Sequence, residues 1–116
     1  MLKNAILFMA MGLLGCQQKQ IHFMVQNSTD TNFDSIIIQG LGNLHFNQLK
    51  KRTATFGIMD YSESKTSTDG GYKITLFENE NNKVMHFGYY SNGIPTCTSY
   101  RIEILKDTIQ VEEIAE

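Results

Sequence analysis

From residue 21 onwards, apolar side chains alternate with polar ones in short runs, and this alternation constrains the fold more than any other feature of the sequence. In residues 21–26, for example, Ile21, Phe23 and Val25 occupy every second position. A period of two separates the two faces of a β-strand, whereas a helix needs a period near 3.6. No stretch of this region sustains the helical period. We therefore expect an all-β domain whose sheets each keep one face in water.

The alternating runs follow one another at spacings of about 8 to 12 residues, as in sandwiches and small barrels. Asn, Asp, Ser and Gly, which favour turns, separate the runs. The predicted strands are residues 21–26, 33–39, 44–49, 54–58, 72–76, 85–89, 100–104 and 108–111. The polar stretch 60–70 is predicted to be a long loop. The pattern predicts a single small antiparallel β-sandwich of seven to eight strands.

Length and charge limit what this domain contains and binds. The chain has 116 residues, enough for one hydrophobic core. Its formal net charge is −2, which argues against a nucleic-acid partner because such partners require a basic face. The basic cluster Lys50-Lys51-Arg52 lies between two predicted strands, so we expect a solvated turn there.

The N-terminus predicts export. Lys3 precedes an uncharged apolar run over residues 5–14, and Gly15 stands directly before Cys16. As a helix the run rises about 15 Å, half of the roughly 30 Å hydrocarbon core of a bilayer. It is therefore too short to span a membrane and is predicted to be a removable signal helix.

The sequence Leu13-Leu14-Gly15-Cys16 resembles the lipobox of bacterial lipoproteins. The resemblance implies cleavage after Gly15, a diacylglycerol on the sulfur of Cys16 and usually a further acyl chain, such as palmitate, on the new amino group. Two or three chains anchor a protein stably. The implied parts are residues 1–15 as the lipoprotein signal peptide, 16–20 as the lipidated cysteine with a short tether, and 21–116 as the sandwich domain.

Gln17 bears on where the lipoprotein resides. An aspartate at this position would resemble the inner-membrane retention signal of some Gram-negative lipoproteins, so we expect attachment to the outer membrane, facing the periplasm. The alternative is an ordinary signal peptide with Cys16 unmodified, which leaves Cys16 able to pair with Cys97 in an oxidising compartment. The neighbours of Cys97 are neutral, so we interpret it as a packed thiol.

The order of the predicted strands carries a second resemblance. Residues 25–28, followed by 33–36 and then 46–49, look like the immunoglobulin-like sandwiches of small bacterial lipoproteins. The resemblance implies an architecture and no particular activity.

An apolar residue, a histidine and a phenylalanine follow one another three times, around His22, His45 and His86. With the apolar neighbours inside, all three imidazoles face outward, and three histidines with an open position would form a catalytic zinc site. The immunoglobulin-like order places His45 and His86 on neighbouring strands and His22 in the other sheet. We therefore expect solvated histidines, with no metal and no cofactor.

Two other patterns mark candidate surface sites. Ser35 and Thr108 each follow an aspartate and precede an isoleucine, which resembles the O-glycosylation acceptor of some Gram-negative bacteria; Thr108 is favoured because its predicted turn is exposed. Tyr89 and Tyr90 lie beside a turn-rich segment. One tyrosine should pack inward and the other face water, where it suits protein or sugar contacts.

The motifs Gly-x-Ser-x-Gly and His-Glu-x-x-His do not occur in the sequence. We therefore predict a lipid-anchored lipoprotein of the periplasm or cell envelope that is no enzyme and acts as an interaction or accessory module. Its predicted partners are the membrane and an unidentified envelope protein or glycan. The alternatives are a periplasmic inhibitor that inserts loop 60–70 into a lytic enzyme, and a metal-dependent enzyme using the three histidines.

Overall fold

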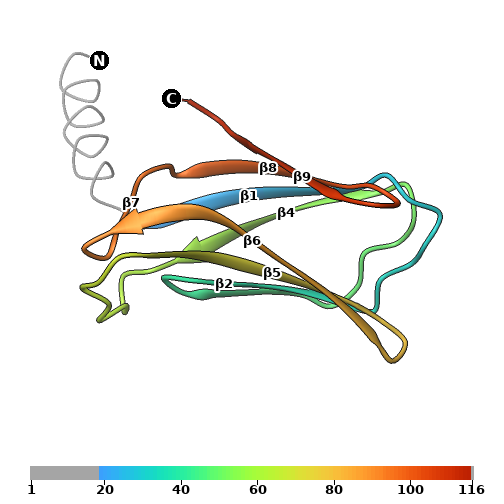
Figure 1. Ribbon diagram of the computed structural model, residues 1–116, viewed down its shortest axis with the longest axis horizontal. Helices are drawn as coiled ribbons and strands as arrows, with labels where there is room; N and C mark the ends of the chain where they lie inside the picture. Colours follow the sequence, from blue (N-terminus) through green and yellow to red (C-terminus); the bar gives the residue numbers. More distant parts are fainter. Residues whose placement is uncertain (1–18, 116) are drawn as a thin grey trace, which may run out of the picture.

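The computed structural model describes residues 19–115, which fold into two packed β-sheets (Figure 1). The strands are β1 (Gln20–Asn27), β2 (Ser35–Gln39), β3 (Asn43–Phe46), β4 (Ala54–Asp60), β5 (Gly70–Glu78), β6 (Asn81–Ser91), β7 (Ile94–Pro95), β8 (Ser99–Ile104) and β9 (Ile109–Glu113). One sheet has the order β4-β1-β8-β9, and the other has the order β3-β2-β5-β6-β7. The predicted all-β sandwich is confirmed.

The described residues form nine strands, one more than the upper number predicted. The additional strand is β7, which lies where the sequence analysis expects a break and pairs with the end of β6. Asn92 and Gly93 connect the two strands, and both have positive φ angles, 53° and 75°. This turn is favourable because Asn and Gly tolerate such angles better than other residues.

One strand pair departs from the predicted antiparallel arrangement. β1 pairs antiparallel with β4 on one side and parallel with β8 on the other, with His22 opposite Ser99 and Asn27 opposite Ile104. The remaining pairs are antiparallel. Alternation in a sequence shows which face of a strand is buried and carries no information on the direction of its neighbour. The parallel pair therefore comes from the packing of the whole domain.

Four aromatic rings fill the centre of the core. Phe23 stacks on Tyr100 with ring centroids 5.4 Å apart, and Phe87 meets Tyr100 edge to face at 5.4 Å. The ring of Tyr72 lies 5.7 Å from that of Tyr100. Burial raises the pKa of both tyrosines, and that of Tyr100 reaches about 12. Gly88, at φ 68°, passes close over the two tyrosines, and a Cβ there would lie 2.8 Å from each of them.

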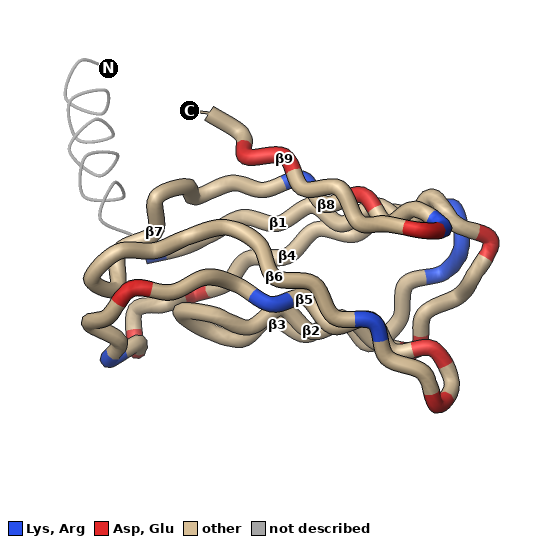
Figure 2. Tube along the Cα trace, viewed as in Figure 1, with Lys and Arg blue, Asp and Glu red and all other residues tan. Residues whose placement is uncertain are grey.

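The described chain begins at one end of the sandwich and forms a hollow at the other. Lys19 accepts a hydrogen bond from the backbone N–H of Tyr61 at 2.9 Å, which places it beside loop 61–69. β1 then runs to the opposite end, where the β1–β2 loop, the β5–β6 turn and the β8–β9 turn gather (Figure 1). Figure 2 shows basic and acidic residues close together on these loops.

Candidate functional site

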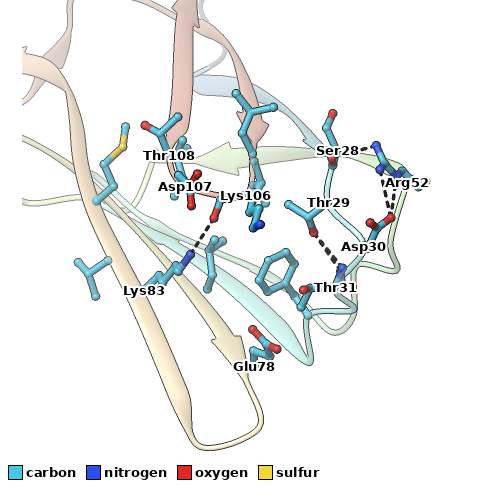
Figure 3. Close-up of a pocket in the computed structure, with 17 residues that line it drawn as sticks. Ser28, Thr29, Asp30, Thr31, Arg52, Glu78, Lys83, Lys106, Asp107 and Thr108 are labelled. Atoms are coloured by element: carbon cyan, nitrogen blue, oxygen red, sulfur yellow. Dashed lines mark hydrogen bonds and ion pairs between the residues drawn. The ribbon is translucent and has the colours of Figure 1, made fainter.

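A cleft of about 600 Å³ opens at the end of the sandwich where β1 finishes (Figure 3). It lies between β6 of one sheet and the β8–β9 turn of the other, which no strand pairing joins. Its floor is apolar, because Phe33, Leu76 and Ile104 of the core reach it. Val84 and Met85 of β6 continue this apolar surface. The cleft therefore offers a partner an apolar surface that the two sheets leave uncovered.

Charged side chains of both signs surround the cleft. Arg52 forms an ion pair with Asp30 at 3.1 Å and donates a further hydrogen bond to the carbonyl of Ser28 at 3.1 Å. The Nζ of Lys83 donates to the carbonyl of Lys106 at 3.3 Å (Figure 3). The Arg52–Asp30 pair is well exposed, so it orients the rim more than it stabilises the fold. A rim of mixed charge suits a partner with polar groups around an apolar centre.

Asn27, the last residue of β1, holds the loops on one side of the cleft. Its side chain is fully buried. The amide nitrogen donates to the carbonyls of Thr31 at 2.8 Å, Leu49 at 3.3 Å and Lys50 at 3.1 Å. The amide oxygen accepts from the backbone N–H of Thr29 at 3.0 Å and from its hydroxyl at 2.6 Å. Asn27 thus joins the β1–β2 loop to the turn that carries Arg52.

The cleft is lined by apolar, charged and hydroxyl side chains. Its lining contains neither histidine nor cysteine. The hydroxyl of Thr29 donates to the amide oxygen of Asn27. The cleft can make apolar contacts, charge pairs and hydrogen bonds through the exposed hydroxyl of Thr108.

The structure does not bring the three histidines together. His22 lies on β1 of one sheet, whereas His45 and His86 lie on β3 and β6 of the other. The expectation that His45 and His86 occupy neighbouring strands is wrong, because β2 and β5 pair between β3 and β6. Residues 19–115 contain no group of three metal-ligating side chains. The ring of His22 instead stacks on Phe56, with centroids 5.8 Å apart.

One tyrosine of the pair Tyr89 and Tyr90 packs inward and the other faces water, as expected. However, the period of two through Phe87 predicts Tyr89 as the inward residue, and the register shift between β5 and β6 at Gly70–Tyr72 reverses this. Tyr90 is partly buried and packs edge to face on Tyr72, with centroids 5.7 Å apart, whereas Tyr89 is exposed. The hydroxyl of Tyr89 donates to Asp69 at 3.0 Å, and this bond is the main reason why the pKa of Tyr89 is raised. Asp69 also accepts from the N–H of Asn92 at 2.9 Å, which lowers its own pKa.

Loop 61–69 is consequently fastened to the β6–β7 turn. Besides the bonds of Asp69, Gly93 donates to the carbonyl of Thr68 at 3.0 Å. Within the loop, Ser64 donates to the carbonyl of Tyr61 at 3.0 Å. These contacts lie beside Lys19 and away from the cleft. Tyr89 is therefore occupied in fixing a loop.

The remaining predicted site residues are scattered. Ser35 begins β2 and is partly buried, whereas Thr108 is exposed in the β8–β9 turn at the edge of the cleft. The thiol of Cys97 is partly buried and donates to the carbonyl of Ser99 at 3.0 Å. The predicted cleavage and lipidation residues, Gly15 and Cys16, lie outside the described residues.

Neither the cleft nor the role of Asn27 is predicted from the sequence. Residues 27–32 have the composition of an ordinary turn, and the one signal is that the side chain of Asn27 is of a type that bonds its own following backbone. The carbonyls that complete its five bonds come from residues 49 and 50, far along the chain. Only the folded structure brings them together.

No known family matches this sequence, and neither does any curated protein. The fold is similar to the NMR structure of a protein from Eubacterium rectale, with a TM-score of 0.52 and 15% sequence identity over 82% of this chain and 88% of that chain. At this identity the likeness shows the fold alone. Among residues 19–115, no helix is long and apolar enough to cross a membrane.

Proposed function

We propose that this protein is a lipid-anchored lipoprotein of the bacterial cell envelope that acts as a non-catalytic interaction module. In this proposal Cys16 carries the lipid, the outer membrane holds the protein facing the periplasm, and the domain is an immunoglobulin-like sandwich. The cleft engages an envelope protein or glycan.

The observation that carries the proposal is the placement of Lys19 and the cleft at opposite ends of the sandwich. Lys19 follows Cys16 by three residues, which span at most about 11 Å when extended. The lipid would therefore attach beside loop 61–69, to which Lys19 is bonded. β1 extends about 26 Å from there towards the cleft, at 3.3 Å per residue. Anchoring at Lys19 leaves the cleft unobstructed.

The anchor is tested by the intact mass of the protein extracted from membranes, compared with a Cys16→Ala variant. The expected mature species starts at Cys16, is heavier by two or three acyl chains, and is lost in the variant. A Cys97→Ser variant is the matched control and should retain the acylated mass. An unacylated native protein would contradict the anchor and make a disulfide between the two cysteines the next question.

The cleft is tested by photo-crosslinking in intact cells from two exposed aliphatic positions. Val84 lies on the cleft and is 54% exposed, whereas Ile94 lies in β7 at the other end and is 67% exposed. A photoreactive residue at position 84 should capture an envelope component that the same residue at position 94 does not. Equal capture from both positions would remove the cleft from the proposal and leave the anchor untouched.

The lytic-enzyme inhibitor is less well supported. An inhibitory loop needs to protrude, and loop 61–69 is held against the β6–β7 turn by Asp69 and Thr68. The metal-dependent enzyme with three histidine ligands is not supported by the strand order, because His22 lies on a different sheet from His45 and His86.

A further inference from the structure

The edge strand β4 lacks the features that usually keep sheet edges from pairing. Unpaired edges are normally protected by short length, charged side chains, proline or bulges. Among the described strands, β3 has four residues, β7 has two and includes Pro95, and β9 carries Glu112 and Glu113. The part of β6 beyond β7 carries Lys83. By contrast, β4 is seven residues long and uncharged up to its last residue, Asp60.

The backbone of β4 is open to pairing along this edge up to its last residue, where the carbonyl of Asp60 lies against Gly42 of the β2–β3 turn. Its odd-numbered residues face β1, because Asn27 donates to the carbonyl of Thr53 and Tyr61 donates to that of Lys19, and bonded pairs alternate along an antiparallel ladder. The N–H and C=O groups of the even-numbered residues therefore point away from β1. In the described part of the chain they make no hydrogen bond outside the ladder. These even-numbered residues are Ala54, Phe56, Ile58 and Asp60.

The side chains beside this free edge are apolar and exposed. Phe56 is 58% exposed and Ile58 is 42% exposed. Met24 of β1, opposite Phe56 in the ladder, is 41% exposed. Aromatic and β-branched residues form the most favourable cross-strand pairs in sheets. The edge thus combines unused hydrogen-bonding groups with side chains suited to a neighbouring strand.

The charges at the two ends of β4 indicate which strand would pair with this edge. The basic turn Lys50-Lys51-Arg52 precedes β4, whereas Asp60 ends it and Glu63 follows. In an antiparallel pair of two β4 strands, the basic end of each copy lies beside the acidic end of the other. A parallel pair would instead place like charges together. The β4 edge is therefore complementary to an antiparallel copy of itself.

We propose that two copies of this chain form a symmetric dimer by antiparallel pairing of their β4 edges about Gly57. This register overlaps all seven residues and places Phe56 opposite Ile58 of the second copy, twice. Asp60 faces Ala54 of the second copy, next to the basic turn that precedes β4 in that copy. The even-numbered residues of the two copies form about six backbone hydrogen bonds across the dyad, because the carbonyl of Asp60 lies against Gly42 in each copy. The two four-stranded sheets become one.

The dimer does not depend on the proposed lipid anchor. Antiparallel pairing places the two Lys19 residues at opposite ends of the shared sheet. Each end of the dimer then holds the cleft of one copy and the Lys19 residue of the other, and two short tethers reach one bilayer when the strands lie along its surface.

The test is the mass of the full-length protein in detergent micelles, measured by sedimentation with the detergent contribution matched out. The native protein should have the mass of two chains. Ile58→Lys places a charge opposite Phe56 of the second copy and should give one chain. Val84→Lys is the matched control, because it puts the same charge on a comparably exposed aliphatic residue of β6 and should leave two. Far-UV circular dichroism verifies that both variants are folded.

A second comparison tests the charge pairing. Asp60→Lys places two basic groups together at each end of the interface and should weaken the dimer about tenfold. Adding Lys51→Glu to the same chain, which leaves the Arg52–Asp30 pair intact, should restore it. A native protein of one-chain mass, or a dimer that survives Ile58→Lys, would overturn the proposal. A one-chain protein that crosslinks through β4 to a different protein would replace self-pairing with strand addition by that partner.

Discussion

Replacing Asn27 with alanine tests whether one buried side chain holds the loops beside the cleft. The amide makes five hydrogen bonds, and the free-energy cost of losing them differs from one bond to the next. The carbonyl of Leu49 keeps its bond from Phe33, and the hydroxyl of Thr29 keeps the carbonyl of Thr31 at 3.3 Å. The backbone N–H of Thr29 loses the acceptor that Asn27 provides while it is buried.

The magnitude follows from these differences. An unsatisfied buried N–H costs about 1–3 kcal/mol, and an ordinary hydrogen bond contributes about 0.5–1.5 kcal/mol. The carbonyls of Thr31 and Lys50 keep bonds from Thr29 and Thr53, so each lost bond counts at about 0.5 kcal/mol. With about 2 kcal/mol for the orphaned N–H of Thr29, we expect Asn27→Ala to lower the free energy of unfolding by about 3 kcal/mol. For a domain near one hundred residues this lowers Tm by roughly 12–24 °C.

The assay is thermal and urea unfolding followed by far-UV circular dichroism. Asn47→Ala is the control, because it removes the same side chain from an exposed position and should change the free energy by less than about 0.5 kcal/mol. A loss below about 1 kcal/mol for Asn27→Ala would contradict this expectation, because water would then be replacing the amide at little cost.

Two further predictions concern the turn and the core. Gly93→Ala should destabilise the protein by about 1–2 kcal/mol in urea unfolding, because the φ angle of Gly93 is positive and a Cβ there would collide with the carbonyl of Thr66. Asn92→Gly, the control, should be neutral or stabilising. Equal losses of stability in the two variants would contradict this prediction. Because the pKa of Tyr100 is raised to about 12, its contribution to stability is complete below pH 10 and declines as the pH rises towards 12. The urea midpoint should fall over that range, and less so in Tyr100→Phe; an equal fall would contradict the assignment.

Alternation predicted the buried face of β1, β5 and β8 but not that of β4, where Phe56 and Ile58 are exposed and Met59 is buried. Ile21, Phe23 and Val25 are fully buried, as their spacing predicts. Alternation also did not predict the extent of a strand that is exposed on both faces. β6 begins at Asn81, not at residue 85, and its first four residues are exposed, so no period marks them. They are held as a strand by their register with β5.

Which strands lie next to one another could not be predicted from the sequence, for a related reason. The parallel pairing of β1 with β8 and the distance between His45 and His86 depend on the order of strands in a sheet, which alternation does not record. The cleft depends on the separation of β6 from the β8–β9 turn. Its residues come from distant parts of the chain, such as Asp30 and Lys106, and each looks like an ordinary loop residue in the sequence.

The central position of β1 has a mechanical consequence. A pull on the lipid of the proposed anchor would reach the domain through Lys19 and act along the axis of β1. β4 and β8 form hydrogen bonds with β1 on its two sides, so the force would load both strand pairs in shear. In the antiparallel pair of β1 and β4, the hydrogen bonds lie roughly perpendicular to the force. Many bonds would have to fail together, whereas an edge strand pulled from its end can peel away one bond at a time. The attachment point is therefore expected to be the most force-resistant place on the domain.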